Sequence, residues 1–228
     1  MSDPLVSVIV PALNGARFLG EALDSIREQS YKRWEVLLVD GGSTDRTLEI
    51  ASRFDRVRTI SQLGSGLAGA WNEGLAAAEG ELIAFLDSDD RWLRDKLSRQ
   101  VALLAADPSI DCAIARVRFV LEPGLPIPSG FRPELLEGDH VANMPSALLA
   151  RRSVFERIGD FDTRWRIAMD IDWFARLKDA GLRTELVPEV MLEKRVHDAN
   201  LSILGGATLN LELVELLRES VARRRGTA

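Results

Sequence analysis

This 228-residue chain has little cysteine, no strongly basic region and no long apolar run. With a single cysteine, Cys112, it cannot form an intramolecular disulfide, a cysteine-rich zinc cluster or a paired redox site. Its apolar runs, such as Leu5 to Val10, are far shorter than the ~20 residues that span a bilayer. Met1 to Asp3 form no basic segment, so we expect no secretory signal and a cytoplasmic protein.

Positive charge is in the minority. The chain has 29 Lys and Arg against 35 Asp and Glu, a net charge of −6, with no wide basic field, so nucleic acid is not expected as a partner. A composition of 46% hydrophobic and 28% charged residues is typical of a globular protein with a substantial core. The length predicts one compact unit with a smaller region added to it.

The first half alternates segments typical of strands and of helices. Val6 to Val10 is β-branched apart from Ser7, which indicates a strand covered on both faces of a parallel sheet. Asn14 is expected to cap the helix that follows and runs to Gln29. The pattern then repeats with strand Trp34 to Val39, a short helix with Leu48 and Ala51, a helix from Leu67 to Ala78 that stops at Gly80 as a left-handed terminator, and strand Leu82 to Leu86.

This alternation predicts an α/β doubly wound fold, with a mostly parallel sheet flanked by helices and ligands at the carboxyl ends of its strands. Polar residues follow three of these strands, at Asn14, at Asp40 and at Asp87 to Asp90, so we expect them to converge on one site. Beyond Pro108 we expect a mixed extension of the sheet. Its parts are an alternating segment Cys112 to Val120, a loop Pro123 to Pro133, a helix Ala168 to Ala180, and two extended pieces around Arg183 to Val187 and Val190 to Val196.

Three carboxylates stand together in Asp87-Ser88-Asp89-Asp90, directly after an apolar strand. Like charges this close repel one another unless a cation neutralises them, and a hard divalent metal shared with a diphosphate would do so. The other interpretation is an acidic turn that caps a helix beginning near Trp92. The segment by itself leaves both open.

Seven short motifs follow one another along the chain. They are Val6-Ser-Val-Ile-Val-Pro-Ala-Leu-Asn14, Val39-Asp-Gly-Gly-Ser-Thr-Asp45, Asn72-Glu-Gly-Leu-Ala-Ala-Ala-Glu-Gly80, Ala84-Phe-Leu-Asp-Ser-Asp-Asp90, Gly159-Asp-Phe-Asp162, Ala168-Met-Asp-Ile-Asp-Trp173 and Arg195-Val-His-Asp-Ala-Asn-Leu-Ser202. In order and spacing they resemble the motifs of family 2 glycosyltransferases with the GT-A fold. The chain departs from the family pattern at Gly41 (commonly Asp), Leu13 (Tyr), Trp71 (Arg) and Met169 (Glu). Trp71 has two interpretations, stacking on a ligand or packing in the core.

The resemblance implies a metal-dependent site for a nucleotide sugar. Asp40 would accept a hydrogen bond from the base, Asp87 would lie by the ribose, and Asp89 would ligate Mn²⁺ or Mg²⁺. His197 is expected as a further metal ligand, although a lone histidine at a strand end is often structural. The residues expected to bind the nucleotide sugar are Pro11, Ala12, Asn14, Asp40, Asn72, Asp87 and Ser88.

Asp170 is the expected catalytic base. On a helix beginning near Ala168 it shares a face with Trp173, whereas Asp172 lines up with Arg176 one turn on. We therefore expect Asp170 to point toward the protein and Asp172 toward solvent or a cation. The helix N-terminus favours an ionised carboxylate and partial burial raises its pKa, a combination that suits a base. The alternative is that Asp170 simply caps its helix.

The resemblance implies an inverting glycosyltransferase of polysaccharide or glycoconjugate synthesis. A nucleoside diphosphate sugar, with a UDP-sugar favoured, would lose its diphosphate to the hydroxyl of an unknown glycan, lipid-linked or small-molecule acceptor. Two alternatives are a nucleotidyltransferase and a catalytically silent sugar-nucleotide-binding protein. Residues 1–110 would bind the nucleotide sugar, 111–203 would bind the acceptor and supply the base, and 204–228 would form a C-terminal helix and basic tail.

An apolar stripe marks the C-terminal helix, and it must be covered. Its members are Leu209, Leu213, Leu216, Leu217 and Val221. Three covers are possible: the catalytic body, a second subunit in a homodimer, or the inner face of a membrane, with Arg223 to Arg225 near anionic lipid. We favour the body or a subunit.

Overall fold

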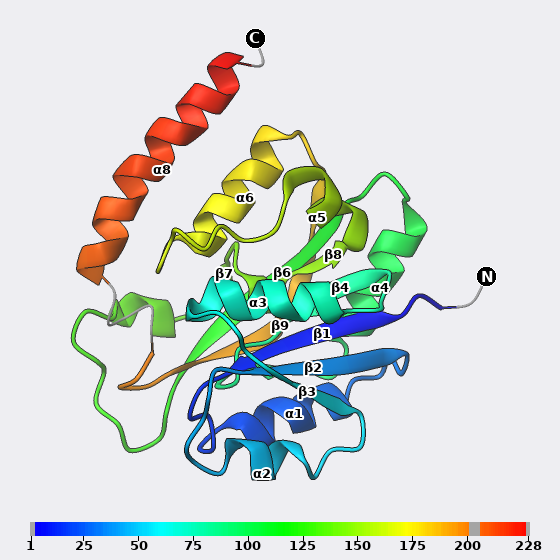
Figure 1. Ribbon diagram of the computed structural model, residues 1–228, viewed down its shortest axis with the longest axis vertical. Coiled ribbons are helices and arrows are strands. Elements are labelled where there is room, and N and C mark those ends of the chain that lie inside the picture. The colour runs from blue at the N-terminus through cyan, green and yellow to red at the C-terminus, as the bar shows by residue number, and fades with distance from the viewer. Residues whose placement is uncertain (1–2, 201–205, 227–228) are drawn as a thin grey trace.

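One nine-stranded mixed sheet organises the protein, in a computed structural model that describes residues 3–200 and 206–226 (Figure 1). The strand order is β3-β2-β1-β4-β8-β6-β9-β5, and β7 pairs with β6. The strands are β1 (Val6–Ala12), β2 (Trp34–Asp40), β3 (Val57–Ser61), β4 (Leu82–Phe85), β5 (Arg91–Trp92), β6 (Cys112–Leu121), β7 (His140–Val141), β8 (Leu149–Arg151) and β9 (Thr184–Val196). The α-helices are α1 (Leu19–Arg27), α2 (Thr47–Ala51), α3 (Gly66–Ala77), α4 (Lys96–Ala106), α5 (Arg152–Ile158), α6 (Met169–Asp179) and α8 (Gly206–Gly226).

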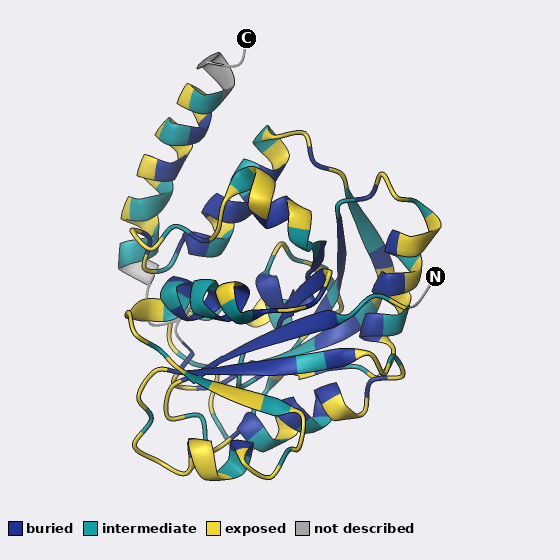
Figure 2. Cartoon of the chain, turned by 45° about the vertical axis from the view of Figure 1, so that its right-hand side comes forward, coloured by how far each residue is buried: buried dark blue, intermediate teal, exposed yellow. Residues whose placement is uncertain are grey.

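Helices cover both faces of this sheet. Strands β3, β2, β1 and β4 are parallel, and β1 is buried along its whole length (Figure 2). Apolar residues of α1 and α4 pack on one face, while those of α3, α5 and α6 pack on the other. The predicted α/β fold with a mostly parallel sheet is confirmed.

The second half extends the same sheet. β8 pairs antiparallel with β4 and β6, and β9 runs parallel to β6. The two extended pieces expected around Arg183 and Val190 are one continuous strand, β9, whose register with β6 shifts near Arg116 so that residues 188 and 189 have no partner there. This irregularity includes Pro188, which has no N–H to donate to a ladder.

Three local expectations are wrong. Asn14 does not cap α1, which begins at Leu19; it lies in a left-handed conformation, φ 52°, in the preceding loop. Trp92 belongs to strand β5, so the helix expected there begins at Lys96. Gly80 is not a left-handed terminator. It is a glycine because a Cβ there would lie 2.6 Å from the carbonyl oxygen of Leu5.

The C-terminal helix α8 packs beside α6 (Figure 1). Leu216 is 3% exposed and Leu209 packs on the same core cluster, so the catalytic body covers part of the stripe. Leu217 and Val221, at 62% and 48% exposed, are left uncovered. In the part of the chain that the structure describes, no helix is both long and apolar enough to cross a membrane.

Candidate active site

The polar residues that end β1, β2 and β4 lie together at one edge of the sheet. Ala12 is paired with Asp40, and the backbone of Leu86, just before Asp87, bonds to Ile9 of β1. Pro11 and Ala12 are buried at the end of β1. The parallel strand order thus brings the three segments to one place, as the alternation predicts.

Hydrogen bonds join the loops after β1 and β2. Asn14 Oδ1 accepts from the Thr44 N–H at 2.9 Å, and the N–H of Gly15 donates to Thr47 Oγ1 at 2.8 Å. Asp40 is buried, and its carboxylate accepts from the N–H groups of Gly42 and Ser43, both at 3.1 Å. Asp40 therefore shapes its own turn, and its role with a nucleotide base stays a prediction.

A lysine of another strand is the counterion of the acidic turn, Asp87 to Asp90. Asp87, Asp89 and Asp90 place oxygen atoms within 4.8 Å of one another. Lys194, on β9, lies 3.2 Å from Asp87 Oδ2 and 3.0 Å from Asp90 Oδ2. Burial alone would lower the pKa of Lys194, but the three carboxylates raise it well above its usual value. Burial raises the pKa of Asp90 to about 7, so Asp87 and Asp89 carry most of the negative charge, and one ammonium against these two carboxylates still leaves an excess.

Asp89 faces the end of β9. Its Oδ2 lies 2.8 Å from His197 Nε2 and 3.2 Å from Asn200 Nδ2. The N–H of Ala199 donates to His197 Nδ1, which leaves Nε2 as the ring nitrogen that faces Asp89. Burial would raise the pKa of Asp89, but the His197 bond and the charge of Lys194 lower it. Asp89 and His197 thus form one unit, and a metal-ligand role for His197 stays a prediction.

Arg195 holds this unit against the first half of the chain. Its guanidinium contacts Glu21 of α1 at 2.7 Å, forms an ion pair with Glu122, and donates to the Asp89 carbonyl at 3.1 Å. It also lies over the ring of Phe18, 4.4 Å from its centroid. Arg195 therefore connects elements of the protein, rather than pointing free toward a phosphate.

Asp170 reaches the site from the start of α6. It is half-buried, and its Oδ1 accepts from the N–H of Ile171 at 2.8 Å. Burial raises the pKa of Asp170 to about 6; Asp87 adds to the rise, and Lys194 and the Ile171 N–H oppose it. The fold therefore brings Asp170 within electrostatic reach of the acidic turn and gives it the pKa of a base that is competent near neutral pH.

Asp172 points toward a cation, as expected, but not toward solvent. It is 2% exposed and lies 2.8 Å from Arg176 Nε. Arg176 also donates to the carbonyls of Ile158, Gly159 and Asp160. This pair anchors α6 to the loop after α5.

Asn72 and Trp71 of α3 both make contacts inside the fold, and both contact Phe161. The amide of Asn72 donates to the Phe161 carbonyl at 2.8 Å and accepts from the Phe161 N–H at 3.0 Å. The contacts that the structure shows for Asn72 therefore join α3 to this loop, while nucleotide-sugar binding by Asn72 stays a prediction. Trp71 is 2% exposed and packs on Phe85 and Phe161, which supports the core interpretation.

The residues of the acidic turn fit a hard divalent cation. Asp87 Oδ1 is buried and has no hydrogen-bond partner among the described residues, which suits a ligand atom. Carboxylate oxygens are the ligands that Mg²⁺ and Mn²⁺ prefer. Ser88 is the second residue of the same turn. Its Oγ lies 3.3 Å from the place where a Cβ on Gly15 would be, so the turn lies close to the loop after β1.

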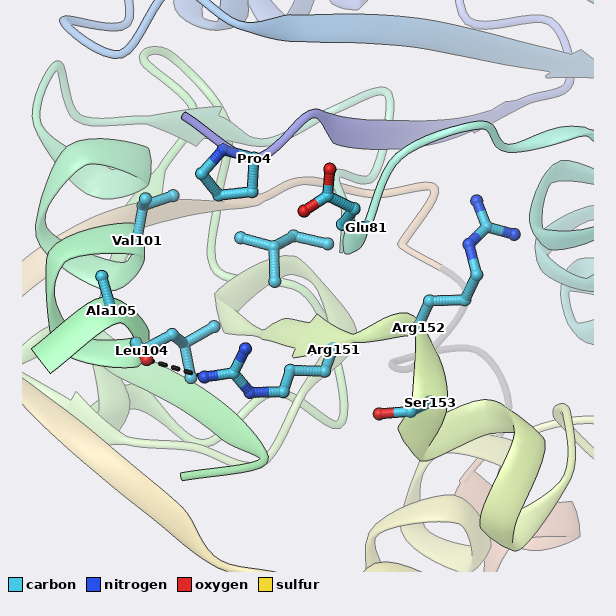
Figure 3. A pocket seen from close by; sticks show the side chains of 9 residues that line it. Pro4, Glu81, Val101, Leu104, Ala105, Arg151, Arg152 and Ser153 are labelled. Carbon is cyan, nitrogen blue, oxygen red and sulfur yellow. Dashed lines mark hydrogen bonds between the residues drawn. The ribbon is translucent and has the colours of Figure 1, made fainter. Parts of the chain in front are cut away.

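A pocket of about 340 Å³ lies at the opposite end of β4 (Figure 3). Arg151 pairs with Leu82 at the start of that strand and donates to the carbonyls of Ile110 and Leu104. Arg152 donates to the carbonyls of Gly80 and Ala78. Both arginines line this pocket, away from the acidic turn, and their donors bind backbone oxygens.

Sequence reasoning missed Lys194 and Asn200. Asn200 lies within a quoted motif, Arg195 to Ser202, whose last two residues, Leu201 and Ser202, are outside the described part of the chain. Lys194 directly precedes that motif, and a lysine in a strand gives no sign of burial. The pairing of β9 with β6 and with β5 brings Lys194 to the acidic turn.

Comparison with known proteins places this geometry in a class. The Pyrobaculum calidifontis mannosyltransferase PcManGT, solved with GDP-Man and Mn²⁺, matches with a TM-score of 0.65 and 29% identity over 85% of this chain and 57% of that one. Staphylococcus aureus TarS, solved with UDP-GlcNAc, matches with a TM-score of 0.70 and 22% identity over 86% of this chain and 59% of that one. The protein therefore has the fold of GT-A-type glycosyltransferases.

The family follows from the sequence itself. The model of Glycosyl transferase family 2 matches residues 7–172, and the chain belongs to that family. A relative of Mycobacterium bovis, a PGL/p-HBAD biosynthesis glycosyltransferase, is 32% identical over 77% of this chain and 70% of its own length. The Escherichia coli glucosyltransferase WfgD, which uses UDP-Glc and a GlcNAc-diphosphoundecaprenol, is 37% identical over 46% of this chain and 42% of its own. The chain spans 42% to 65% of the length of three other curated relatives.

Proposed function

We propose that this protein is a metal-dependent, inverting glycosyltransferase. It moves a sugar from a nucleoside diphosphate sugar, with a UDP-sugar favoured, to an acceptor hydroxyl in polysaccharide or glycoconjugate synthesis. The observation that carries the proposal is Asp170, a half-buried carboxyl at the start of α6 that lies within electrostatic range of Asp87 and Lys194 and whose pKa is raised to about 6. Relatives that act in glycoconjugate synthesis support it.

Asp170 acts as the base. Its ionised carboxylate accepts the proton of the acceptor hydroxyl while the oxygen attacks the anomeric carbon from the face opposite the diphosphate, and one displacement inverts the configuration. The acceptor is a glycan, a lipid-linked saccharide or a small molecule. Binding both substrates in line lowers the entropic part of the barrier.

The acidic turn and β9 hold the leaving group. Asp89, with His197 beside it, would hold Mn²⁺ or Mg²⁺, and such an ion supplies positive charge for the departing diphosphate. Asp87 lies by the ribose, Ser88 also binds the nucleotide sugar, and Pro11, Ala12 and Asp40 surround the nucleobase. Asn14 and Asn72 complete the nucleotide-sugar set.

The test is a panel of UDP-, GDP- and dTDP-sugars incubated with the protein and Mn²⁺. We expect one donor to release its nucleoside diphosphate, and Asp170→Asn to remove most of that turnover, by a factor of ~10² to 10⁴, while leaving UDP binding nearly intact. Asp55→Asn, an exposed aspartate of the turn before β3, is the matched control. Donor binding without turnover in the unaltered protein would support a catalytically silent binding protein.

A further inference from the structure

Helix α6, which contains Asp170, has no cap of its own. Its N-cap residue is Ala168, whose side chain cannot accept a hydrogen bond. The backbone N–H groups that lead into the helix instead donate to Glu212 of α8: Arg166 at 2.8 Å, Ile167 at 3.0 Å and Ala168 at 2.8 Å. A carboxylate from a distant helix thus fixes the three residues that lead into α6, at the end of the helix where the dipole favours negative charge.

The far end of α6 is held by the same helix. Asp179, the last residue of α6, accepts from Ser220 Oγ at 2.9 Å and from Arg223 Nε at 3.2 Å. Ala168 to Asp179 and Glu212 to Arg223 are equal in sequence length, about 16.5 Å of helix at 1.5 Å per residue. The two helices therefore run side by side in the same direction (Figure 1), and polar contacts join α8 to the residues just before α6 and to its last residue.

The contact between the helices is firm along its length. Leu216, between the two polar contacts, is buried in the core cluster that contains Trp173 of α6. Glu219 adds an ion pair at 3.2 Å with Arg164, which lies in the segment before α6. Burial would raise the pKa of Glu212, but its three backbone hydrogen bonds lower it, so the carboxylate is ionised at neutral pH.

Asp170 depends on the geometry of this helix start. It lies in the first turn, and its Oδ1 accepts from the N–H of Ile171 in the same turn. If the first turn unwinds, the carboxylate loses that bond and its direction. A displacement of ~1 Å can cost a reacting group ~10² in rate.

We propose that Glu212 is a positioning residue for Asp170, so that α8 acts on the site through this one side chain. This inference rests on the proposed role of Asp170 as the base. Glu212 touches neither donor nor acceptor; it fixes the start of α6, and through it the direction of the Asp170 carboxylate.

The experiment compares Glu212→Ala and Glu212→Gln with Glu215→Ala, an exposed glutamate on the same helix, in the full chain. Turnover is measured with the donor that the panel shows to be hydrolysed fastest. Each rate is divided by the number of UDP-binding sites, which calorimetry with UDP and Mn²⁺ determines. We expect kcat to fall ~10- to 100-fold in Glu212→Ala and less in Glu212→Gln, which keeps one acceptor oxygen. The donor KM and the UDP affinity should not change, and Glu215→Ala should match the unaltered protein.

Hydrogen exchange gives a readout that does not depend on turnover. Amides of the peptide 161–170 should exchange faster in Glu212→Ala than in Glu215→Ala, because their acceptor is gone. If Glu212→Ala does not fold, turnover and hydrogen exchange are both measured on Glu212→Gln.

Two results separate this inference from the proposed function. Unchanged kcat per binding site in the Glu212 variants, with turnover lost in Asp170→Asn, would overturn the inference and leave the function standing. Turnover retained in Asp170→Asn would overturn the function. A loss in which the number of binding sites falls as much as the rate would show that Glu212 only supports folding.

Discussion

Lys194 Nζ lies 3.0 Å from Oδ2 of Asp90, a completely buried carboxylate that is 104 positions earlier in the chain. The same ammonium reaches Asp87 Oδ2 at 3.2 Å. The pair ties the acidic turn after β4 to strand β9. It also leaves Asp89 as the carboxylate of the turn that faces His197 instead of the lysine.

Loss of this lysine should destabilise the fold. Lys194→Met leaves Asp90 buried without its countercharge, and breaking a buried pair costs about 3–5 kcal/mol. Chemical denaturation at pH 7 measures the free energy of unfolding, with Lys178→Met, an exposed lysine of α6, as the control. Adding Asp90→Asn to Lys194→Met should recover part of the loss. Equal stability of Lys194→Met and the unaltered protein would show that the pair contributes nothing.

Donor binding should need a divalent ion. The affinity for UDP should fall when a chelator is added and in Asp89→Ala, because the diphosphate would otherwise face carboxylates with little compensation. Calorimetry with and without Mn²⁺ measures this, and Asp55→Ala is the control. UDP affinity that is unaffected by both the chelator and the Asp89 change would contradict the metal assignment.

Turnover should depend on pH through Asp170. Its pKa is raised to about 6, so the base form is lost as pH falls through that value, and kcat should decline below it. The sign for stability is opposite: a raised carboxyl pKa favours folding at low pH, and this contribution is lost as pH rises through about 6. Rate profiles from pH 5 to pH 8 of the unaltered protein test the first point. Denaturation of the protein and of Asp170→Asn at about pH 4, 5, 6 and 7 tests the second, because the difference in bound protons lies between the unfolded and the folded pKa.

Two neighbouring leucines of α8 should differ in how much they contribute to the free energy of unfolding. Leu216 is 3% exposed and Leu217 is 62% exposed. Leu216→Ala should therefore lower the free energy of unfolding by about 2–5 kcal/mol, and Leu217→Ala by less than about 0.5 kcal/mol. Truncation at Gly205 should also lower the melting temperature. Equal effects of the two substitutions would mean that α8 does not dock on α6 in solution.

The exposed apolar side of α8 keeps two of the sequence predictions open, a homodimer contact and a peripheral contact with an anionic membrane. Its residues include Leu211, Val214, Leu217 and Val221. If a second subunit covers it, a double variant Leu217→Glu and Val221→Glu should sediment as a smaller species than the unaltered chain. If a membrane covers it, the double variant should lose salt-sensitive binding to phosphatidylserine vesicles. No difference in either assay would contradict both.

The half of the site built on β1, β2 and β4 could be predicted because its signals are local. A buried apolar strand that ends in a polar residue places that residue at the carboxyl edge, and parallel neighbours put Ala12 beside Asp40. The outcome at Asp172 was harder to predict. The alignment of Asp172 with Arg176 one turn on predicts their ion pair. The burial of this pair depends on the carbonyls of the loop after α5 and on Arg223 of α8, 3.9 Å from Asp172.

The long-range contacts leave no comparable trace in the sequence. Glu212 follows no capping rule, because the helix start that it caps is more than 40 residues earlier. Ala168 gives the opposite signal, since alanine is a poor N-cap. Such contacts depend on how α8 docks, which a single sequence does not define.

Strand β9 also bears on the order in which the protein can acquire its site during synthesis. Lys194 and His197 come late in the chain, and the pairing of β9 with β5 beside the acidic turn closes a loop of about 100 residues, the kind of long-range contact that slows folding. Until β9 leaves the ribosome, Asp87 and Asp90 must remain solvated or protonated, since the ammonium that pairs with them has yet to be made. A nascent chain that ends before residue 194 should therefore bind UDP poorly even with β1 to β4 complete, and affinity should appear only when the last strand is added.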